Sequence, residues 1–434
     1  MTAAVDTAAR PLRHQSFLIW FAAIAGGLAI HIALWPYSEP PWIFSDFYKA
    51  YWVAGEHLWN GGLGAGYPFT VKGNWSNLPI LAWPFALLVP LGREAAGWTY
   101  LGIGICVTLA AWALLVRLSG LRGTMAALLL FLFLVNGPLL NSLREGNSTH
   151  FVLLIMIAGV WAWQEKHDFL AGFAFGICAA IKPLLALIGI YFLVRRRWGV
   201  VAGGATSIGI AVLLSLAVFG VQGNLLWYDE AVKPYLGHAV AAFNVQSIDG
   251  FLIRLSTGAG ELLYWGPIEP SPLHKIARHV SFLVLLGGFG WLMWRAERAR
   301  LISPQTGAGV TGHDLLQFSM VLILSMLLSP AAWTHYYLVF ILPLGLYLGG
   351  RLPMPDDAVT RWLFWIGYVL SALPVVMPAM DPESELPRGL AAEIAARTLV
   401  SAWMFGAILM LAAFARGAWL ASRSGENPAE SARA

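Results

Sequence analysis

An acidic residue, Asp46, follows the first long apolar segment of the chain and precedes a helical pattern. In that pattern the apolar residues recur on one side of a helix, at Phe47, Tyr51, Ala54 and Leu58. Such a stripe is typical of a helix that lies in a membrane interface rather than crossing it. A carboxylate held there can act as a general base. The alternative is that Ser45 or Asp46 caps the helix, or that Asp46 complements its dipole.

Two further residues have side chains that suit a phosphate. Lys182 lies in the middle of an apolar segment, where a cation is costly, and Pro183 breaks the helix at that point. We expect two half-helices with Lys182 at their junction and its ammonium facing an anion; the alternative is a snorkelling or ion-paired lysine. His335 follows a Pro-broken helix end together with Trp333. It can donate to a phosphate or a sugar hydroxyl, or it can be one hydrogen-bonded histidine in an aromatic belt.

A polar stretch later in the chain combines amides, a hydroxyl and a guanidinium within eleven residues, at Asn244, Gln246, Ser247 and Arg254. This set suits sugar or phosphate recognition, and a solvated loop is the alternative. The nucleotide motif GxxxxGK[ST] and the zinc motifs HExxH and paired CxxC are absent from the sequence. We therefore predict no nucleotide-driven motor, no bound metal and no cofactor.

The composition decides what must position these residues. Of 434 residues, 58% are hydrophobic and 12% are charged, about half the ~25% of a soluble domain. Most of the surface must therefore face lipid, which excludes a nucleic-acid binder, a disordered chain and a secreted disulfide scaffold. We predict an all-α, polytopic transmembrane helical bundle with about twelve spans. These are near 17–35, 77–92, 95–116, 124–142, 147–164, 169–194, 198–221, 279–295, 314–330, 334–350, 361–378 and 397–420.

The predicted orientation follows from the basic residues of the loops, which are enriched on the cytoplasmic side. With the N-terminus inside, the inner loops carry fifteen arginines, among them Arg93, and the short outer loops carry five basic residues, among them Arg117 and Arg122. Both termini are then cytoplasmic, and Asp46 lies on the outer side. The first apolar segment is expected to be retained, because it is long for a signal sequence and no small-residue cleavage site follows it.

The predicted spans form a single integral membrane domain, 1–434, with two long outer loops. The loops 36–78 and 222–278 carry polar and aromatic residues and helix-like patches without a long apolar run. We expect interfacial helices in both loops. The tail 421–434 is small and polar, so we expect it to be disordered.

Several ordered motifs resemble those of glycosyltransferase family 87, the membrane mannosyltransferases with the GT-C fold, over roughly residues 17–350. An aspartate after the first span, a Tyr-rich helix and a Gly turn match Asp46 through Tyr67. The other matching segments are Gly146-Asn147-Ser148-Thr149, Ala179 to Pro183 followed by Arg195-Arg196-Arg197-Trp198, Asn244-x-Gln246-Ser247 with Arg254, and Ser329-Pro330-x-x-Trp333-x-His335. In this segment Asn147 and Thr149 stand where the family pattern has other amide residues. This difference bears on the identity of the sugar or the acceptor more than on the type of reaction.

The resemblance implies an inverting glycosyl transfer on the outer face of a bacterial inner membrane. One sugar, commonly mannose, would move from a polyprenyl-phosphate donor to a lipid or glycan acceptor, with membrane lipids around the protein and no nucleic acid. Asp46 would be the general base, and Lys182, His335 and Arg254 would bind the donor phosphate. The implied substrate-binding residues are Tyr48, Lys49, Tyr67, Asn147, Asn244, Gln246, Ser247 and Trp333.

Three alternatives remain open at the level of sequence. Some related enzymes transfer arabinofuranose, and a glycan ligase of the same fold shares the chemistry but moves a longer chain. A flippase or transporter of lipid-linked sugars would also have intramembrane cations and many spans, but it would not need a carboxylate base at the outer surface. A further alternative concerns the mechanism: a divalent metal ion bound through Asp46 could stabilise the leaving phosphate in place of the cationic side chains.

Overall fold

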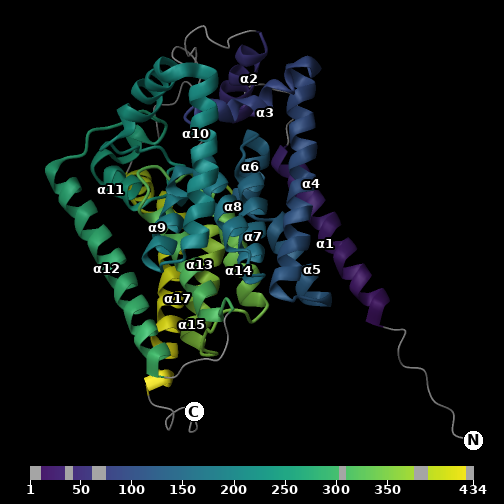
Figure 1. The fold of residues 1–434 in the computed structure, drawn as a ribbon, viewed down its shortest axis with the longest axis vertical. Coiled ribbons are helices and arrows are strands. Elements are labelled where there is room, and N and C mark those ends of the chain that lie inside the picture. The colour runs from purple at the N-terminus through teal and green to yellow at the C-terminus, as the bar shows by residue number, and fades with distance from the viewer. Residues whose placement is uncertain (1–10, 35–42, 61–74, 303–308, 376–389, 427–434) are drawn as a thin grey trace, which may run out of the picture.

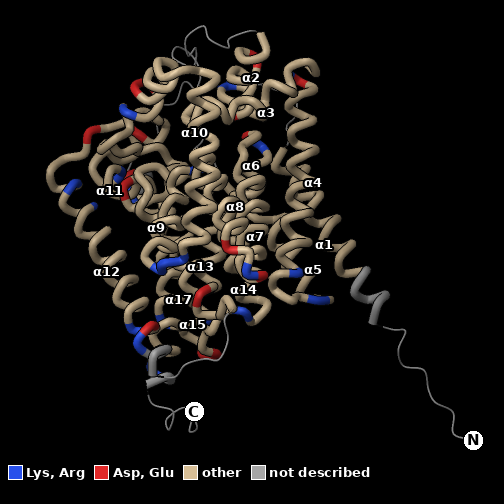
Figure 2. Tube along the Cα trace, viewed as in Figure 1, with Lys and Arg blue, Asp and Glu red and all other residues tan. Residues whose placement is uncertain are grey.

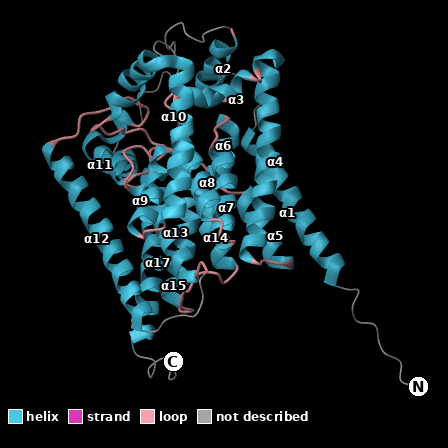
Figure 3. Ribbon diagram, viewed as in Figure 1, coloured by secondary structure: helices cyan, strands magenta, loops and turns pink. Residues whose placement is uncertain are grey.

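The computed structural model describes residues 11–34, 43–60, 75–302, 309–375 and 390–426, and within these ranges every regular element is a helix. The chain forms a helical bundle, as Figures 1 and 3 show. Two isolated bridges, Ala239 with Ile268 and Val245 with Trp333, are the extended pairings within the described part. The all-α prediction is therefore confirmed.

The principal helices are bounded as follows: α1 Pro11–Leu34, the π-helix η1 Phe47–Tyr51, α2 Trp52–Trp59, α3 Trp83–Ala86, α4 Arg93–Ser119, α5 Gly123–Leu134, α6 Gly137–Glu145, α7 Thr149–Gln164, α8 Asp168–Ile181, α9 Ala186–Val194, α10 Trp198–Trp227, α11 Ile248–Thr257, α12 Pro272–Ile302, α13 Gly312–Leu327, the 3-10 helix η9 Thr334–Phe340, α14 Ile341–Leu348, α15 Ala358–Ser371, α16 Leu390–Arg397 and α17 Ala402–Glu426. The predicted tail 421–434 thus begins inside α17, and residues 427–434 lie outside the described part.

Five stretches are long and apolar enough to cross a membrane: Phe17–Leu34, Arg93–Ser119, Trp198–Tyr235, Pro272–Arg298 and Glu393–Arg423. A sixth is added if α5 and α6, which meet at 49°, form one bent span. The other apolar helices have 10–17 residues, fewer than the ~20 that a straight span needs. The chain is a multi-pass membrane protein, and the count of long helices is smaller than the predicted twelve.

Two predicted spans have other structures. Segment 77–92 forms three short helical pieces within Pro79–Leu91, because Pro79, Pro84 and Pro90 interrupt any longer helix. Segment 169–194 is divided at Lys182, as predicted, into α8 and α9. Gly199, just after α9, lies against Asp168 at the start of α8, since a Cβ on Gly199 would be 2.9 Å from that of Asp168. The chain therefore leaves this helical hairpin at the end where it entered, and Lys182 is near its tip.

The two differences change which loop residues share an end of the bundle. Arg93 stacks on Tyr48, with its guanidinium carbon 4.6 Å from the ring centroid, so it lies on the side of α2 and not on the predicted opposite side. The 27 residues of α4 carry the chain away from there, so Arg117 and Arg122 lie at the other end. Because the hairpin at Lys182 reverses the chain direction once more, Arg195 lies on the side that the sequence predicted, the one where the termini lie. Figure 1 shows α1 beginning and α17 finishing at this same end, away from α2 and α3.

The interior of the bundle depends on one fully enclosed helix and on close packing of small residues. In α13, every residue from Asp314 to Leu327 is buried. α8 and α10 approach closely at glycines: a Cβ on Gly172 would lie 1.8 Å from the carbonyl oxygen of Val200, and one on Gly203 would lie 2.0 Å from that of Phe169. Small residues permit this approach between membrane helices.

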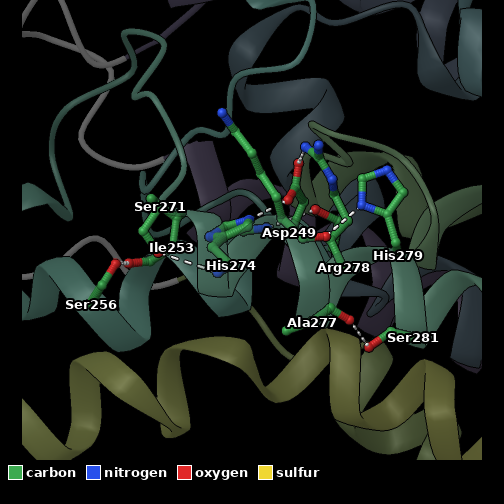
Figure 4. A network of polar contacts seen from close by, with 12 residues as sticks. Asp249, Ile253, Ser256, Ser271, His274, Ala277, Arg278, His279 and Ser281 are labelled. Carbon is green, nitrogen blue, oxygen red and sulfur yellow. Dashed lines mark hydrogen bonds and ion pairs between the residues drawn. The ribbon is translucent and has the colours of Figure 1, made fainter.

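α12 packs on the outside of the bundle through half-buried apolar side chains such as Phe282, Leu285 and Phe289, and further contacts hold it toward its two ends. None of its most apolar 18-residue window is buried. At one end Trp291 stacks on Trp419 of α17, with 5.0 Å between ring centroids. At the other end Asp249 of α11 accepts from His274 at 2.5 Å and pairs with Arg278 at 3.4 Å. Figure 4 shows these three side chains converging between the two helices.

We predict that Asp249→Ala lowers the free energy of unfolding by about 3–5 kcal/mol, because it leaves His274 and Arg278 without their buried counter-ion. The Asp249 and His274 side chains are 1% and 4% exposed. Thermal unfolding in detergent would measure the loss.

Asp229→Ala is the matched control, since Asp229 pairs at 3.0 Å with Lys233 on the surface, where the two side chains are 53% and 64% exposed. Its unfolding temperature should stay close to that of the wild type. Equal losses in the two variants would contradict the assignment of Asp249 as the anchor of α12.

Candidate active site

Four segments far apart in sequence meet near the end of the bundle that holds α2. They are the start of η1 with Asp46, the α6–α7 turn with Asn147, the tip of the α8–α9 hairpin with Lys182, and η9 with His335. Asp46 is half-buried, and Asn147, Lys182 and His335 are each 5% exposed. A set of polar side chains buried this deeply in an apolar bundle needs partners or a ligand.

The α6–α7 turn docks directly on the chain around Asp46. The Phe44 amide donates to the Arg144 carbonyl at 2.7 Å, and the Ser45 hydroxyl donates to the Glu145 carboxylate. Ser45 is therefore not the helix cap that the sequence suggested, and Asp46 makes no side-chain cap bond either. η1 is a π-helix, a geometry often found at functional sites.

A glycine permits the close docking of this turn. Gly146 ends α6 with φ of +67°, and a Cβ there would lie 2.6 Å from Cβ of Phe47. The residue before Ser45, Phe44, also has a positive φ of 59°, which is strained for an aromatic residue. Glycine adopts this conformation at a helix end without strain, so the packing has to hold only Phe44 in an unfavourable conformation.

Asn147 connects the predicted base to the predicted phosphate cation. Its Nδ2 donates to Oδ2 of Asp46 at 2.8 Å, and its Oδ1 accepts from Nζ of Lys182 at 3.1 Å. The Thr149 amide and hydroxyl also donate to Oδ1, at 3.2 and 2.9 Å, and they fix the orientation of the amide. One side chain therefore satisfies an anion with its donor and a cation with its acceptor.

Lys182 and His335 are joined through an aromatic ring. Nζ of Lys182 lies 4.4 Å from the ring centroid of Tyr336, and the Tyr336 and His335 rings meet edge-to-face with centroids 4.8 Å apart. Neither ring nitrogen of His335 has a hydrogen-bond partner among the described residues, and both are buried. The described residues therefore offer His335 no hydrogen bond of the kind that the belt-histidine alternative requires.

The electrostatics of Asp46 reflect its position. Burial raises the pKa of the carboxyl above its usual value, while the hydrogen bond from Asn147 and the charges of Lys182 and Lys49 oppose this shift. A carboxyl with a raised pKa is a better proton acceptor when it is ionised, which is the property that a general base needs.

The structure gives Arg254 a different role from the one predicted. Arg254 is fully buried, and its guanidinium donates to the carbonyls of Ala242 and Val245 at 3.0 and 2.8 Å and to the Ser401 hydroxyl at 2.9 Å. These bonds hold the chain before α11 in place. They argue against Arg254 as a direct phosphate ligand, because the guanidinium is already bound to the scaffold.

One end of each amide of the same motif is also bound to the scaffold, while the buried Oε1 of Gln246 has no hydrogen-bond partner among the described residues. Nε2 of Gln246 donates to the carbonyls of Phe243 and Val400 at 2.7 and 2.6 Å, and Ser247 caps α11. Asn244 accepts from Trp265 at 3.0 Å.

The backbone of this segment pairs with the turn before His335. Val245 forms a bridge with Trp333, the Gln246 amide donates to Ala332 at 2.6 Å, and the Thr334 amide donates to Asn244 at 2.8 Å. The motif thus positions His335, and this pairing between two distant motifs could not be read from the sequence.

The remaining predicted substrate residues surround the centre less closely. Tyr48 is half-buried under Arg93, Lys49 is exposed and Trp333 is half-buried. Tyr67 lies outside the described residues.

Sequence reasoning missed two residues of the centre. Glu145, which is bound by Ser45, was visible only as part of a polar turn, and Tyr336 was visible only as one of several aromatics in the Trp333–Tyr337 segment. Within the described ranges, His, Cys, Asp and Glu side chains do not gather in threes that could hold a metal ion.

Comparisons with known proteins agree with the motifs. A model of glycosyltransferase family 87 matches residues 75–309, more than half of the chain. An alpha-(1->3)-arabinofuranosyltransferase of Corynebacterium glutamicum is 28% identical over 158 residues, 35% of this chain and 37% of that protein. A polyprenol-phosphate-mannose-dependent alpha-(1-2)-phosphatidylinositol pentamannoside mannosyltransferase of Mycolicibacterium smegmatis is 26% identical over 319 residues, 70% of each chain.

A polyprenol-phosphate-mannose-dependent alpha-(1-2)-phosphatidylinositol mannoside mannosyltransferase of Mycobacterium tuberculosis is 24% identical over 444 residues, 86% of this chain and 94% of that protein. The chain therefore spans about a third of the length of the first of these relatives, and most of the length of the other two. The matched range 75–309 contains Asn147 and Lys182, while Asp46 and His335 lie outside it. Because the family model covers more than half of the residues, and the ordered motifs agree with it, the chain belongs to glycosyltransferase family 87.

Proposed function

We propose that this family member moves one sugar, mannose in the first instance, from a polyprenyl-phosphate donor to a lipid or glycan acceptor. The observation that carries the proposal is the chain of contacts from Asp46 through Asn147 to Lys182, beside a His335 whose two nitrogens find no partner among the described residues. It puts a proton acceptor and two potential phosphate ligands in one buried centre. Two of the relatives are named as polyprenol-phosphate-mannose-dependent enzymes.

The proposed reaction is a single displacement. The acceptor hydroxyl gives its proton to Asp46, and its oxygen attacks the anomeric carbon of the donor sugar. The bond from that carbon to the phosphate oxygen breaks, its electron pair stays on the lipid phosphate, and the anomeric configuration inverts. Lys182 and His335 stabilise the charge that grows on the phosphate, the first as a cation and the second as a hydrogen-bond donor, and such preorganised groups act strongly in a site of low dielectric constant. The balance requires no nucleotide.

We further propose that this centre faces the outer side of a bacterial inner membrane and that both termini are cytoplasmic. In Figure 2, Lys and Arg gather at the lower ends of α5 and α12, the end where α17 also finishes. Basic residues are enriched on the cytoplasmic side of membrane proteins. The opposite end, with α2 and Asp46, is then the outer one.

The base is tested by Asp46→Asn, which removes the proton acceptor and keeps the size of the side chain. Turnover with polyprenyl-phosphate-mannose should fall by ~10²–10⁴-fold, while donor binding and the unfolding temperature stay near wild type. The assay follows a lipid product that is one hexose heavier by mass spectrometry. Wild-type turnover in this variant would remove Asp46 from the mechanism, and transport without a new glycosidic bond would favour the flippase.

The pH dependence tests the role of Asn147. Because its hydrogen bond holds the pKa of Asp46 down against the effect of burial, Asn147→Leu should raise that pKa further. The base must be ionised to act, so the acidic limb of turnover against pH should move to higher pH. Asn141→Leu is the matched control, because the Asn141 amide donates to the Thr334 hydroxyl at 3.5 Å and not to Asp46. An unchanged acidic limb in Asn147→Leu would show that another group controls the profile.

The phosphate site is tested by Lys182→Ala and His335→Ala. Each should weaken binding of polyprenyl-phosphate-mannose by roughly tenfold or more, as expected for a hydrogen bond to a charged group. The double variant should lose less than the sum of the singles, because residues that share a ligand are not additive. Lys182→Arg should recover only part of the binding, since a planar fork does not replace a point charge.

The unfolding temperature distinguishes a role of His335 in ligand binding from a role in stabilising the fold. His335→Leu should leave the unfolding temperature unchanged or slightly higher, because the imidazole has no hydrogen bond to lose among the described residues. Wild-type donor affinity in both single alanine variants would contradict the phosphate site.

A further inference from the structure

A cavity of about 570 Å³ opens on the outer side of the helix that begins at Asp46. Its volume falls in the ~300–1,000 Å³ range of small-molecule sites. Its walls include three aromatic rings, an acid, an amide and a guanidinium: Tyr48, Trp52, Trp59, Glu56, Asn60 and Arg93. No residue of the phosphate centre lines it, so it is a separate feature of the molecule.

The cavity uses a different face of the helix from the predicted apolar stripe. Phe47, Tyr51, Ala54 and Leu58 are buried at 0%, 5%, 0% and 4% exposure and pack into the core. Tyr48, Trp52, Glu56 and Trp59 recur four, four and three residues apart, so they share another face. One helix therefore packs into the bundle on one side and lines an open cavity on the other.

The lining is suited to a sugar ring. A hexose presents apolar C–H faces and a rim of hydroxyls. The cavity presents one exposed aromatic ring, that of Trp59, beside a carboxylate and an amide, while Trp52 is 6% exposed and packs into the core. Trp59 is 53% exposed, so its ring is accessible. Arg93 already stacks on Tyr48 at 4.6 Å, and the carboxylate of Glu56 repels an anionic ligand. These features favour a neutral carbohydrate over a phosphate or a lipid chain.

We propose that this cavity binds a sugar of the glycan acceptor at a position remote from the hydroxyl that reacts. The inference rests on the proposed function, because it specifies the acceptor of that same site. Tyr48 follows Asp46 by two residues, which is about 3 Å along a helix axis. We infer that an acceptor with more than one sugar extends from Asp46 around the helix into the cavity, so the cavity selects acceptors by glycan length.

The kinetic test compares two lipid acceptors that differ by one mannose at the end that does not react. In Trp59→Ala the KM of the longer acceptor should rise roughly two- to tenfold, the cost of one aromatic contact. Its kcat and the KM of the shorter acceptor should stay unchanged. Glu56→Gln should raise the same KM. Trp161→Ala is the matched control, because Trp161 is 46% exposed on α7 and lies outside the cavity lining.

A binding test needs no turnover and separates the two proposals. Saturation-transfer NMR with mannotriose and the purified full-length protein should give a signal in wild type and Trp161→Ala that is lost in Trp59→Ala. If mannotriose binds in this way while no donor supports transfer, the cavity proposal stands and the proposed function fails.

If transfer proceeds but the cavity variants match wild type in KM and mannotriose binding, the cavity proposal fails. It also fails if Trp59→Ala alters only the association with lipid vesicles, which would make Trp59 an interfacial anchor.

Discussion

The burial of a carboxylate and an ammonium around one amide is the constraint on which the centre depends. Either charge alone would be very costly inside an apolar bundle. Asn147 makes their joint burial possible, because its nitrogen donates to Asp46 and its oxygen accepts from Lys182. Its orientation is set by Thr149, so the α6–α7 turn must dock where it does. The close contact of Gly146 with Phe47 is a consequence of that docking.

His335 contrasts with this satisfied arrangement. Its ring is as deeply buried as Lys182, but both nitrogens lack partners among the described residues. An unpaired buried group costs stability and needs an explanation. The proposed lipid phosphate supplies one, because an anion would satisfy the imidazole and add a counter-charge for Lys182. The scaffold around it is rigid: Trp333 pairs with Val245, and Arg254 donates to the Val245 carbonyl from within the core.

The helix that begins at Asp46 connects the centre to the outer cavity. Its apolar stripe packs into the bundle, which fixes the direction of the helix and with it the place of Asp46. A neighbouring face contributes the buried Trp52 and the exposed Trp59 to the cavity. One short helix thus serves both proposed sites. Its first residues place the proposed base in the protein interior, and its outer face carries the proposed contacts to the acceptor.

The sequence by itself determined the helical class, the membrane environment, the family and most of the central residues, because composition, apolar runs and ordered motifs are local properties. The break at Lys182 was predictable from Pro183. Only the tertiary structure decided that segments 77–92 and 169–194 return to the end where they start, since apolar length does not report direction. It alone gave Arg254 and Gln246 scaffold roles and joined Asp46 to Lys182 through Asn147, because contacts between residues 35 and 101 positions apart leave no local periodicity.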